Sequence, residues 1–159
     1  MSSKNSPFNS PLEIGIRCLA LLDSSYPTGL DVNRLVDFDY LLIHSGDIDG
    51  PKSLHPPLPL RTGEIIIKRK LIQRALFLMI NKKLIKRKAT NDGIQYYLDE
   101  NGRPFIRSLN SEYVEKLTDR ANWVLEEYGS TSDEALRALI SNFFDRWTTN
   151  FQSTERYSE

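Results

Sequence analysis

An Asp-Gly turn between two strand-like runs, placed after three helical segments, constrains the fold of this chain more than any other feature. Asn91, Asp92 and Gly93 separate the runs 84–90 and 94–98, and Asp-Gly in this setting is a strong signal for a β-hairpin. Helix, helix, helix and hairpin is the order of elements in a winged helix-turn-helix. We therefore expect a mainly helical fold in which the hairpin forms the wing.

Each of the three helical segments begins with a capping residue. Ser10 is followed by proline at the first helical position and by Glu13, which completes a capping box. Asp31 caps the second segment and Thr62 caps the third. The expected helices cover residues 11–23, 32–44 and 63–83.

Apolar residues at helical spacing predict which faces the first and third helices bury. In the first helix, Cys18 lies beside the apolar face and is expected to pack as a small hydrophobe. In the third helix, most of the basic residues lie opposite a wide apolar stripe. The predicted buried faces are Leu12, Ile16, Leu19 and Leu22 in the first helix, and Ile65, Ile66, Leu71, Ile72, Leu76, Met79 and Ile80 in the third.

Glycine and proline separate the remaining segments. Residues 45–60 contain enough of both to predict a long, stiffened loop rather than a helix or a central strand. Beyond Pro104, a short helical piece is expected through Phe105 and Leu109. We divide the chain into a flexible N-terminus (1–9), a winged-helix-like domain (10–100), a C-terminal helical extension (101–151) and a frayed tail (152–159).

Two amphipathic helices are expected in the C-terminal extension. Gly129 is a natural C-terminal cap for the first of them, and Thr131 with Glu134 forms a capping box that opens the second. The aromatic residues of the second helix either complete the core, which we favour, or dock on a partner protein. They are Phe143, Phe144 and Trp147.

The formal net charge is zero, with 21 basic and 21 acidic residues, but the charges are segregated along the chain. Residues 61–88 hold ten basic side chains and a single acidic one, Glu64, and the flanking segments 1–60 and 89–159 are both acidic. A local positive field of this kind attracts phosphate or an acidic protein surface whatever the total charge. The even balance therefore conceals a basic segment.

Two interpretations of this basic segment remain open: contact with nucleic-acid phosphates through the third helix and the wing, or docking of an acidic protein surface. The third helix is apolar over so much of its surface that little remains for reading base edges. Any nucleic-acid binding would therefore be weakly sequence-selective. The candidate contacts are Lys68, Arg69, Lys70, Arg74, Lys82, Lys86, Arg87 and Lys88.

Catalytic and metal-binding patterns are not evident in the sequence. His44, Asp47, Asp49 and His55 lie close together, but their spacing matches no ordinary zinc pattern, and we favour a structured loop over a metal site. No phosphate-cradling glycine loop or nucleophile elbow is present, and one cysteine cannot form an internal disulfide. We expect a cytoplasmic protein without enzymatic activity, metal, cofactor, membrane segment or small-molecule substrate.

Several motifs together resemble the middle-component proteins of bacterial ABC-three-component conflict systems, which include the Lamassu type of anti-phage and anti-plasmid defence. The resemblance spans residues 8–128 and is carried by the stretches FNSPLEIGIRCLALLDSSYP and LVDFDYLLIHSGDIDGPKSLHPPLPLRTGEIIIKRKLIQRALFLM, followed by LIKR and the hairpin. It marks as signature positions His44, Ser45, Gly46, Asp47, Ser53, Leu54, His55, Pro56, Arg61, Gly63 and Glu64.

The resemblance implies a small, non-catalytic subunit that lies between an SMC-like or Rad50-like ABC ATPase and an effector, often a nuclease. DNA would then be contacted by the complex as a whole. The glycine- and proline-stiffened loop would present a rigid binding surface. The alternative from another class is a free-standing winged-helix regulator that binds DNA by itself.

Overall fold

The computed structural model describes residues 10–48, 50–54 and 62–143, and within them it confirms a mainly helical fold with one antiparallel hairpin after the third helix. None of the described helices is both long and apolar enough to span a bilayer. The elements are α1 (Pro11–Ser25), α2 (Val32–Ile43), the 3-10 helix η1 (Ser45–Ile48), α3 (Thr62–Asn81), β1 (Ile85–Thr90), β2 (Gly93–Leu98), α4 (Gly102–Ser108), α5 (Glu112–Tyr128) and a further helix over 133–143.

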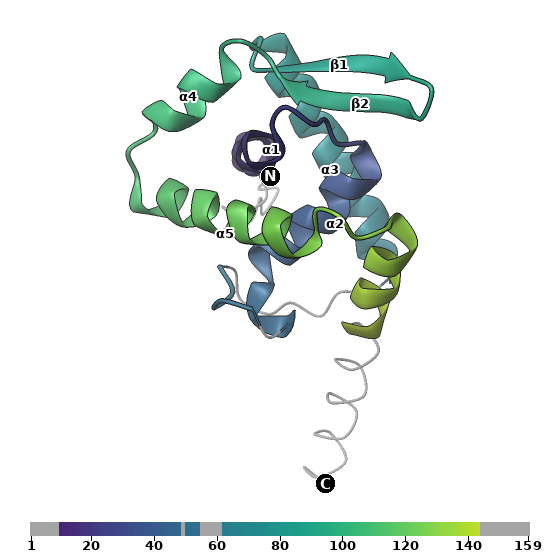
Figure 1. Ribbon diagram of the computed structural model, residues 1–159. Helices are drawn as coiled ribbons and strands as arrows, with labels where there is room; N and C mark the ends of the chain where they lie inside the picture. Colours follow the sequence, from purple (N-terminus) through teal and green to yellow (C-terminus); the bar gives the residue numbers. More distant parts are fainter. Residues whose placement is uncertain (1–9, 49, 55–61, 144–159) are drawn as a thin grey trace, which may run out of the picture.

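Helix α1 lies at the centre of the fold, with α2, α3, α4 and α5 around it (Figure 1). Its buried residues therefore run round much of the helix and include Ile14, Cys18 and Leu21. The prediction of one buried face is wrong at Leu12, which is 50% exposed. A helix with neighbours on several sides does not follow the one-face pattern of a surface helix.

The predicted helix starts are confirmed at α1 and α2. The Ser10 hydroxyl accepts from the Glu13 amide at 3.1 Å, and Asp31 Oδ1 accepts from the Arg34 amide at 2.8 Å. The cap of the last helix was misplaced by one residue, because Ser132 rather than Thr131 accepts from the amide of the first turn, that of Ala135 at 3.2 Å.

Helix α3 ends before the predicted residue 83 because the chain turns there into a left-handed conformation. Lys83 has φ of 60°, its amide donates to Ile80 O at 2.9 Å, and the Leu84 amide donates to Met79 O at 2.9 Å. This pair of bonds is a Schellman motif, which usually has glycine at the left-handed position. Because lysine occupies that position instead of glycine, the sequence does not indicate where the helix ends.

The predicted wing is confirmed, with β1 and β2 paired antiparallel from Ile85 opposite Leu98 to Thr90 opposite Gly93. The hairpin also has a short backbone pairing with a third segment, which the sequence did not predict. Leu30 exchanges backbone hydrogen bonds with Tyr96 at 3.0 and 2.8 Å, which attaches the turn between α1 and α2 to the free edge of β2. The wing is therefore hydrogen-bonded to the helical body and does not extend from it as a free loop.

The prediction that residues 45–60 form no helix is wrong at Ser45–Ile48, which form the short 3-10 helix η1. A single 3-10 turn needs few residues between breakers and is common as a connector. The core also extends into the C-terminal helix, where Leu136 and Ile140 are 0% and 5% exposed. Phe143 is half-buried. The predicted core positions Phe144 and Trp147, and the predicted flexible ends 1–9 and 152–159, lie outside the described residues.

Arg34 of α2 holds the junction between α5 and the C-terminal helix. Its Nη1 donates to Thr131 O and to Asp133 Oδ1, both at 2.8 Å, and its Nη2 donates to Gly129 O at 3.1 Å. One guanidinium thus satisfies carbonyls at the end of α5 and a carboxylate at the start of the next helix.

Replacing Arg34 with alanine is expected to lower the free energy of unfolding by about 2 kcal/mol, because the junction carbonyls lose a charged, partly buried donor. Hydrogen exchange of the amides over 130–143 should accelerate more than that of α1. Urea unfolding and exchange mass spectrometry measure the two effects, with Arg87→Ala on the exposed wing as the matched control. Equal stability of the two variants would contradict the assigned role.

Candidate functional site

Arg17 and Asp39 form an ion pair in the interior of the protein. Arg17 lies on α1 and is 1% exposed, and Asp39 lies on α2 and is 0% exposed. The guanidinium donates from Nε to Asp39 Oδ1 at 2.6 Å and from Nη2 to Oδ2 at 3.1 Å. A two-point contact between guanidinium and carboxylate combines strength with defined geometry, so the pair fixes α1 against α2.

Three more residues extend this pair into a network that we call the buried charge cluster: Glu13, Arg17, Asp39, Lys68 and Tyr113. Lys68 of α3 places Nζ 3.1 Å from Asp39 Oδ2, and Glu13 Oε1 lies 3.8 Å from Arg17 Nη1. The Tyr113 hydroxyl, on α5, donates to Glu13 Oε1. Two cations, two carboxylates and one phenol hydroxyl thus connect the central helix α1 to α2, α3 and α5 around it (Figure 1).

Burial and opposite charges act against each other on the pKa values of the cluster. Burial alone would raise the pKa of Asp39, but Arg17 and Lys68 outweigh it and hold the pKa of that carboxyl well below its usual range. Burial likewise opposes the charged form of Arg17, yet Asp39 raises the pKa of the guanidinium. Burial lowers the pKa of Lys68, against the attraction of Asp39. The cluster is held together by charge in an apolar surrounding.

The end of α2 connects the buried charge cluster to the loop that follows. Lys68 Nζ lies 5.6 Å from the centre of the Tyr40 ring, within cation–π range. The centre of the Tyr40 ring lies 5.0 Å from that of the His44 ring. His44 is 3% exposed and is the C-cap residue of α2. This signature histidine therefore faces the interior of the protein.

The signature residues after His44 tie the loop to itself; we call residues 44–48 and 50–54 the tied loop. The Ser45 side chain is 0% exposed, and its hydroxyl donates to Pro51 O at 2.7 Å. The Gly46 amide donates to the Ser53 hydroxyl oxygen at 2.9 Å, and the Leu54 amide donates to Ile43 O at 3.1 Å. Ser45, Gly46 and Ser53 thus hold backbone in place, which explains why these residue types occur together.

Gly50 brings the tied loop into contact with α5. A Cβ atom at this position would lie 2.5 Å from Cη2 and Cζ2 of Trp123 and 2.8 Å from Ser45 O. Only a residue without a side chain fits between this ring and this carbonyl. The loop is therefore closed by its own hydrogen bonds and packs against α5 at the Trp123 ring.

The described residues include only part of the predicted signature set. His55, Pro56 and Arg61 lie outside them, and for Asp47, Gly63 and Glu64 only the backbone position is described, in η1 and at the start of α3. In residues 10–48, 50–54 and 62–143, no three His, Cys, Asp or Glu side chains are grouped as metal ligands. Because Asp49 and His55 are outside these ranges, the absence of a metal site stays a prediction.

The predicted cationic residues separate into one that points inward and seven at the surface. Lys68 belongs to the buried charge cluster and has 16% of its side chain exposed. Arg69 donates to the side chain of Asn33 on α2, and Lys88 Nζ lies 5.5 Å from the centre of the Tyr97 ring. Their contacts with DNA or with an acidic partner stay predictions. The exposed residues are Arg69, Lys70, Arg74, Lys82, Lys86, Arg87 and Lys88.

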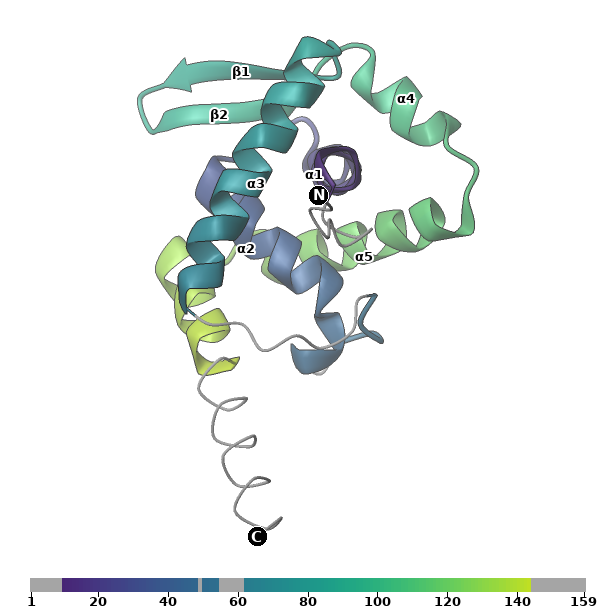
Figure 2. The same ribbon diagram turned by 180° about the vertical axis from the view of Figure 1, so that it is seen from behind.

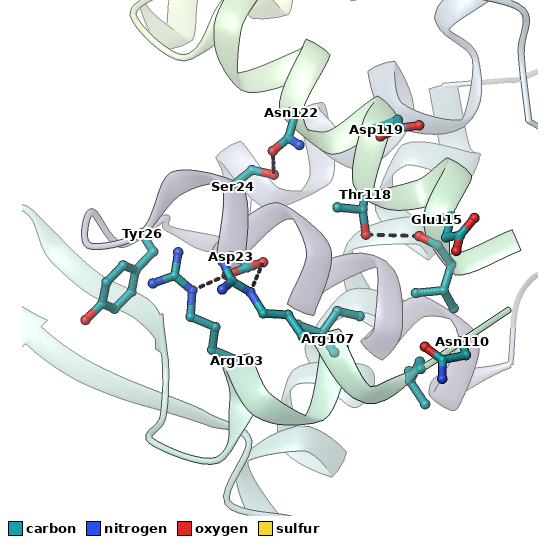
Figure 3. Close-up of a pocket in the computed structure, with 13 residues that line it drawn as sticks. Asp23, Ser24, Tyr26, Arg103, Arg107, Asn110, Glu115, Thr118, Asp119 and Asn122 are labelled. Carbon is teal, nitrogen blue, oxygen red and sulfur yellow. Dashed lines mark hydrogen bonds and ion pairs between the residues drawn. The ribbon is translucent and has the colours of Figure 1, made fainter. Parts of the chain in front are cut away.

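A surface cavity of about 630 Å³, which the sequence did not indicate, lies between the end of α1, α4 and α5 (Figure 3). Its polar walls are largely paired with each other: Arg103 Nε donates to Asp23 Oδ1 at 2.8 Å, and the Ser24 hydroxyl donates to Asn122 Oδ1 at 2.7 Å. The described residues that line it include no histidine and no cysteine. Its contacts join α1, α4 and α5.

Cys18 packs in the core, as predicted. It is 0% exposed, and burial raises the pKa of its thiol, so the thiol is protonated at neutral pH. A nucleophilic cysteine needs the opposite surroundings, with a depressed pKa and access to solvent.

Arg17, Asp39 and Tyr113 could not be identified from the sequence as members of a site. One signal was present, since Glu13 and Arg17 stand at i and i+4 on one helix, where an ion pair forms. Asp39 also interrupts the run of apolar residues in α2 that ends at Ile43. Neither signal indicates that the partners come from three different helices.

These elements define the class of protein: a mainly helical, winged-helix-like protein with C-terminal helices, braced internally by charged side chains. Residues 7–150 match the sequence model of the family described as ABC-three component (ABC-3C) system Middle Component 2. The chain belongs to this family, which confirms the resemblance to middle-component proteins and implies further components of a three-component system. No curated protein and no protein of solved structure matches the chain.

Proposed function

We propose that this protein is a non-catalytic bridging subunit that links an SMC-like or Rad50-like ABC ATPase to an effector, often a nuclease. The whole assembly would serve in bacterial defence of the Lamassu type against phages and plasmids. The ATPase and the effector would supply the chemistry. This chain would orient or restrain the effector and could add a surface that contacts DNA phosphates.

The observation that carries the proposal is membership of the middle-component family over residues 7–150. Two features of the chain support it. The tied loop is held by Ser45, Ser53 and Trp123 in one conformation, and a preorganised surface loses less entropy on binding than a flexible one. Arg17, Asp39 and Cys18 are buried, so these three side chains are not accessible to a substrate.

The alternative is a winged-helix regulator that acts without partners, and the exposed cations of the wing favour it. Such regulators usually bind DNA as two-fold dimers. The two functions differ in what the purified chain binds, so one set of purifications separates them.

Co-expression of the full chain with the ATPase and effector proteins of the same system tests the proposal. We expect one stoichiometric complex by size-exclusion chromatography with light scattering, and no change in the effector's reaction chemistry when this chain is omitted. A chain that stays outside the complex and binds a defined DNA sequence as a dimer would overturn the bridging role in favour of the regulator.

A further inference from the structure

The outward face of α3 exposes three large apolar side chains. Ile66 is 61% exposed, Ile67 is 57% exposed and Phe77 is 65% exposed. The predicted burial of Ile66 is therefore wrong. Single exposed apolar residues are ordinary, but several on one face of one helix are a property of interaction surfaces.

Cationic residues share this face with the apolar ones. At 100° per residue, Ile66, Lys70, Arg74 and Phe77 fall within one quarter of the helix circumference. The inward side of the same helix carries the buried Ile72, Ala75, Leu76 and Met79. Figure 2, in which α3 lies in front, shows the length of this helix at the surface.

We infer that this face of α3 docks an acidic, amphipathic helix of a partner component. The inference rests on the proposed function and names one of its contact surfaces. Ile66 and Phe77 are eleven residues apart, which spans about 16 Å or three helical turns. A partner helix of similar length could cover Ile66, Ile67 and Phe77 with its apolar side chains and place carboxylates beside Lys70 and Arg74.

Charge selects an acidic partner over a neutral one. Lys70 and Arg74 are both exposed, and no described carboxylate forms a salt bridge with either. Carboxylates at the edge of an apolar contact raise the rate of encounter and fix its register. Because Lys68 points inward to Asp39, the positive charge of the outward face comes from Lys70 and Arg74.

The apolar residues on this face also distinguish a protein partner from DNA. Surfaces that bind DNA are more polar and more positively charged than protein–protein interfaces. A Phe77 side chain that is 65% exposed would gain little beside phosphates, whereas in a protein interface an aromatic anchor commonly contributes most of the binding energy.

The test uses the complex formed by the full chain with the ATPase and effector components. Phe77→Asp, and separately Lys70→Glu with Arg74→Glu, should each weaken binding of one component at least about tenfold. Raising the salt concentration should weaken the wild type more than the charge-reversed variant. Ile94→Asp, at a wing position that is 49% exposed, is the matched apolar control, and Lys116→Glu on α5 is the charge control; both should bind as the wild type does.

A photo-crosslinker identifies what covers this face. With Gln73 replaced by p-benzoylphenylalanine, we expect a crosslink to an acidic helix of one partner component. A crosslink to DNA, to a second copy of this chain or to its own residues 144–159 would overturn the inference. So would wild-type binding by both the Phe77 and the charge-reversed variants. Failure of the wild-type chain to join any complex would instead refute the proposed function, so the two failures are distinguishable.

Discussion

Replacing Asp39 with asparagine is expected to lower the free energy of unfolding by about 3–5 kcal/mol, the usual cost of removing one partner from a buried ion pair. Asparagine keeps the shape of the side chain but removes the charge that compensates Arg17 and Lys68. The Arg17 guanidinium, with 1% of its surface exposed, cannot reach water to compensate. Urea unfolding followed by far-UV circular dichroism at pH 7 measures the loss.

The matched control is Asp119→Asn, which makes the same chemical change at an exposed position on α5. We expect this variant to unfold within about 0.5 kcal/mol of the wild type, as surface substitutions generally do. If Asp39→Asn were as stable as the control, charge would contribute nothing to the centre of the fold, and the bracing role of the cluster would be refuted.

The pH dependence of stability supplies a second readout of the same residue. The pKa of Asp39 in the folded protein is well below its usual range, and that of an unfolded aspartate is about 3.9. The stability from this carboxylate is therefore fully present above about pH 4 and is lost as the pH falls toward the folded value. The difference in stability between the wild type and Asp39→Asn should narrow below pH 4.

The order of elements could be predicted because each has a local signal. The Ser10 and Asp31 caps fix two helix starts, and Asp92 with Gly93 fixes the turn of the wing. Such signals depend on interactions within a few residues of the chain, so a single sequence contains them. They fail where the local chemistry is atypical, as at Lys83, where a left-handed lysine ends α3.

The candidate site was less predictable because its members meet only after folding. Arg17 and Asp39 are 22 residues apart in the chain, and Tyr113 is 100 residues from Glu13. Helical spacing from Ile72 places Lys68 on the inward side of α3 and Lys70 on the outward side, but it does not show that Asp39 of another helix pairs with Lys68. The predicted basic surface therefore included one residue that serves the interior.

The exposed apolar residues of α3 do not follow the rule that apolar residues at helical spacing are buried in the core. A stripe at helical spacing predicts burial in the chain's own core, and Ile72, Leu76 and Met79 obey it. Ile66 does not, and it lies together with Phe77, which the predicted stripe did not include, on the side opposite to that core. Residue type alone does not distinguish an apolar side chain that packs in the core from one that stays exposed. The assembled fold is needed to separate the two.

Replacing Gly50 with alanine is expected to lower the free energy of unfolding by about 1–3 kcal/mol, the range for adding a methyl group to a filled space. The new Cβ would lie 2.5 Å from the Trp123 ring and 2.8 Å from Ser45 O. Neither contact is tolerable, so the tied loop must move away from α5. Hydrogen exchange over residues 45–54 should accelerate more than that of α1.

A double-mutant cycle with Trp123→Ala tests whether the ring causes this loss. Removing the ring has its own cost, but it makes room for the added methyl group, so Gly50→Ala should cost about 1 kcal/mol less in that background. The Ser45 carbonyl remains, so part of the cost should persist. Additive losses would show that the loop is not seated on Trp123. If the tied loop is a partner-binding surface, Gly50→Ala should also weaken the complex while Asp119→Asn does not, because only the first variant moves the loop.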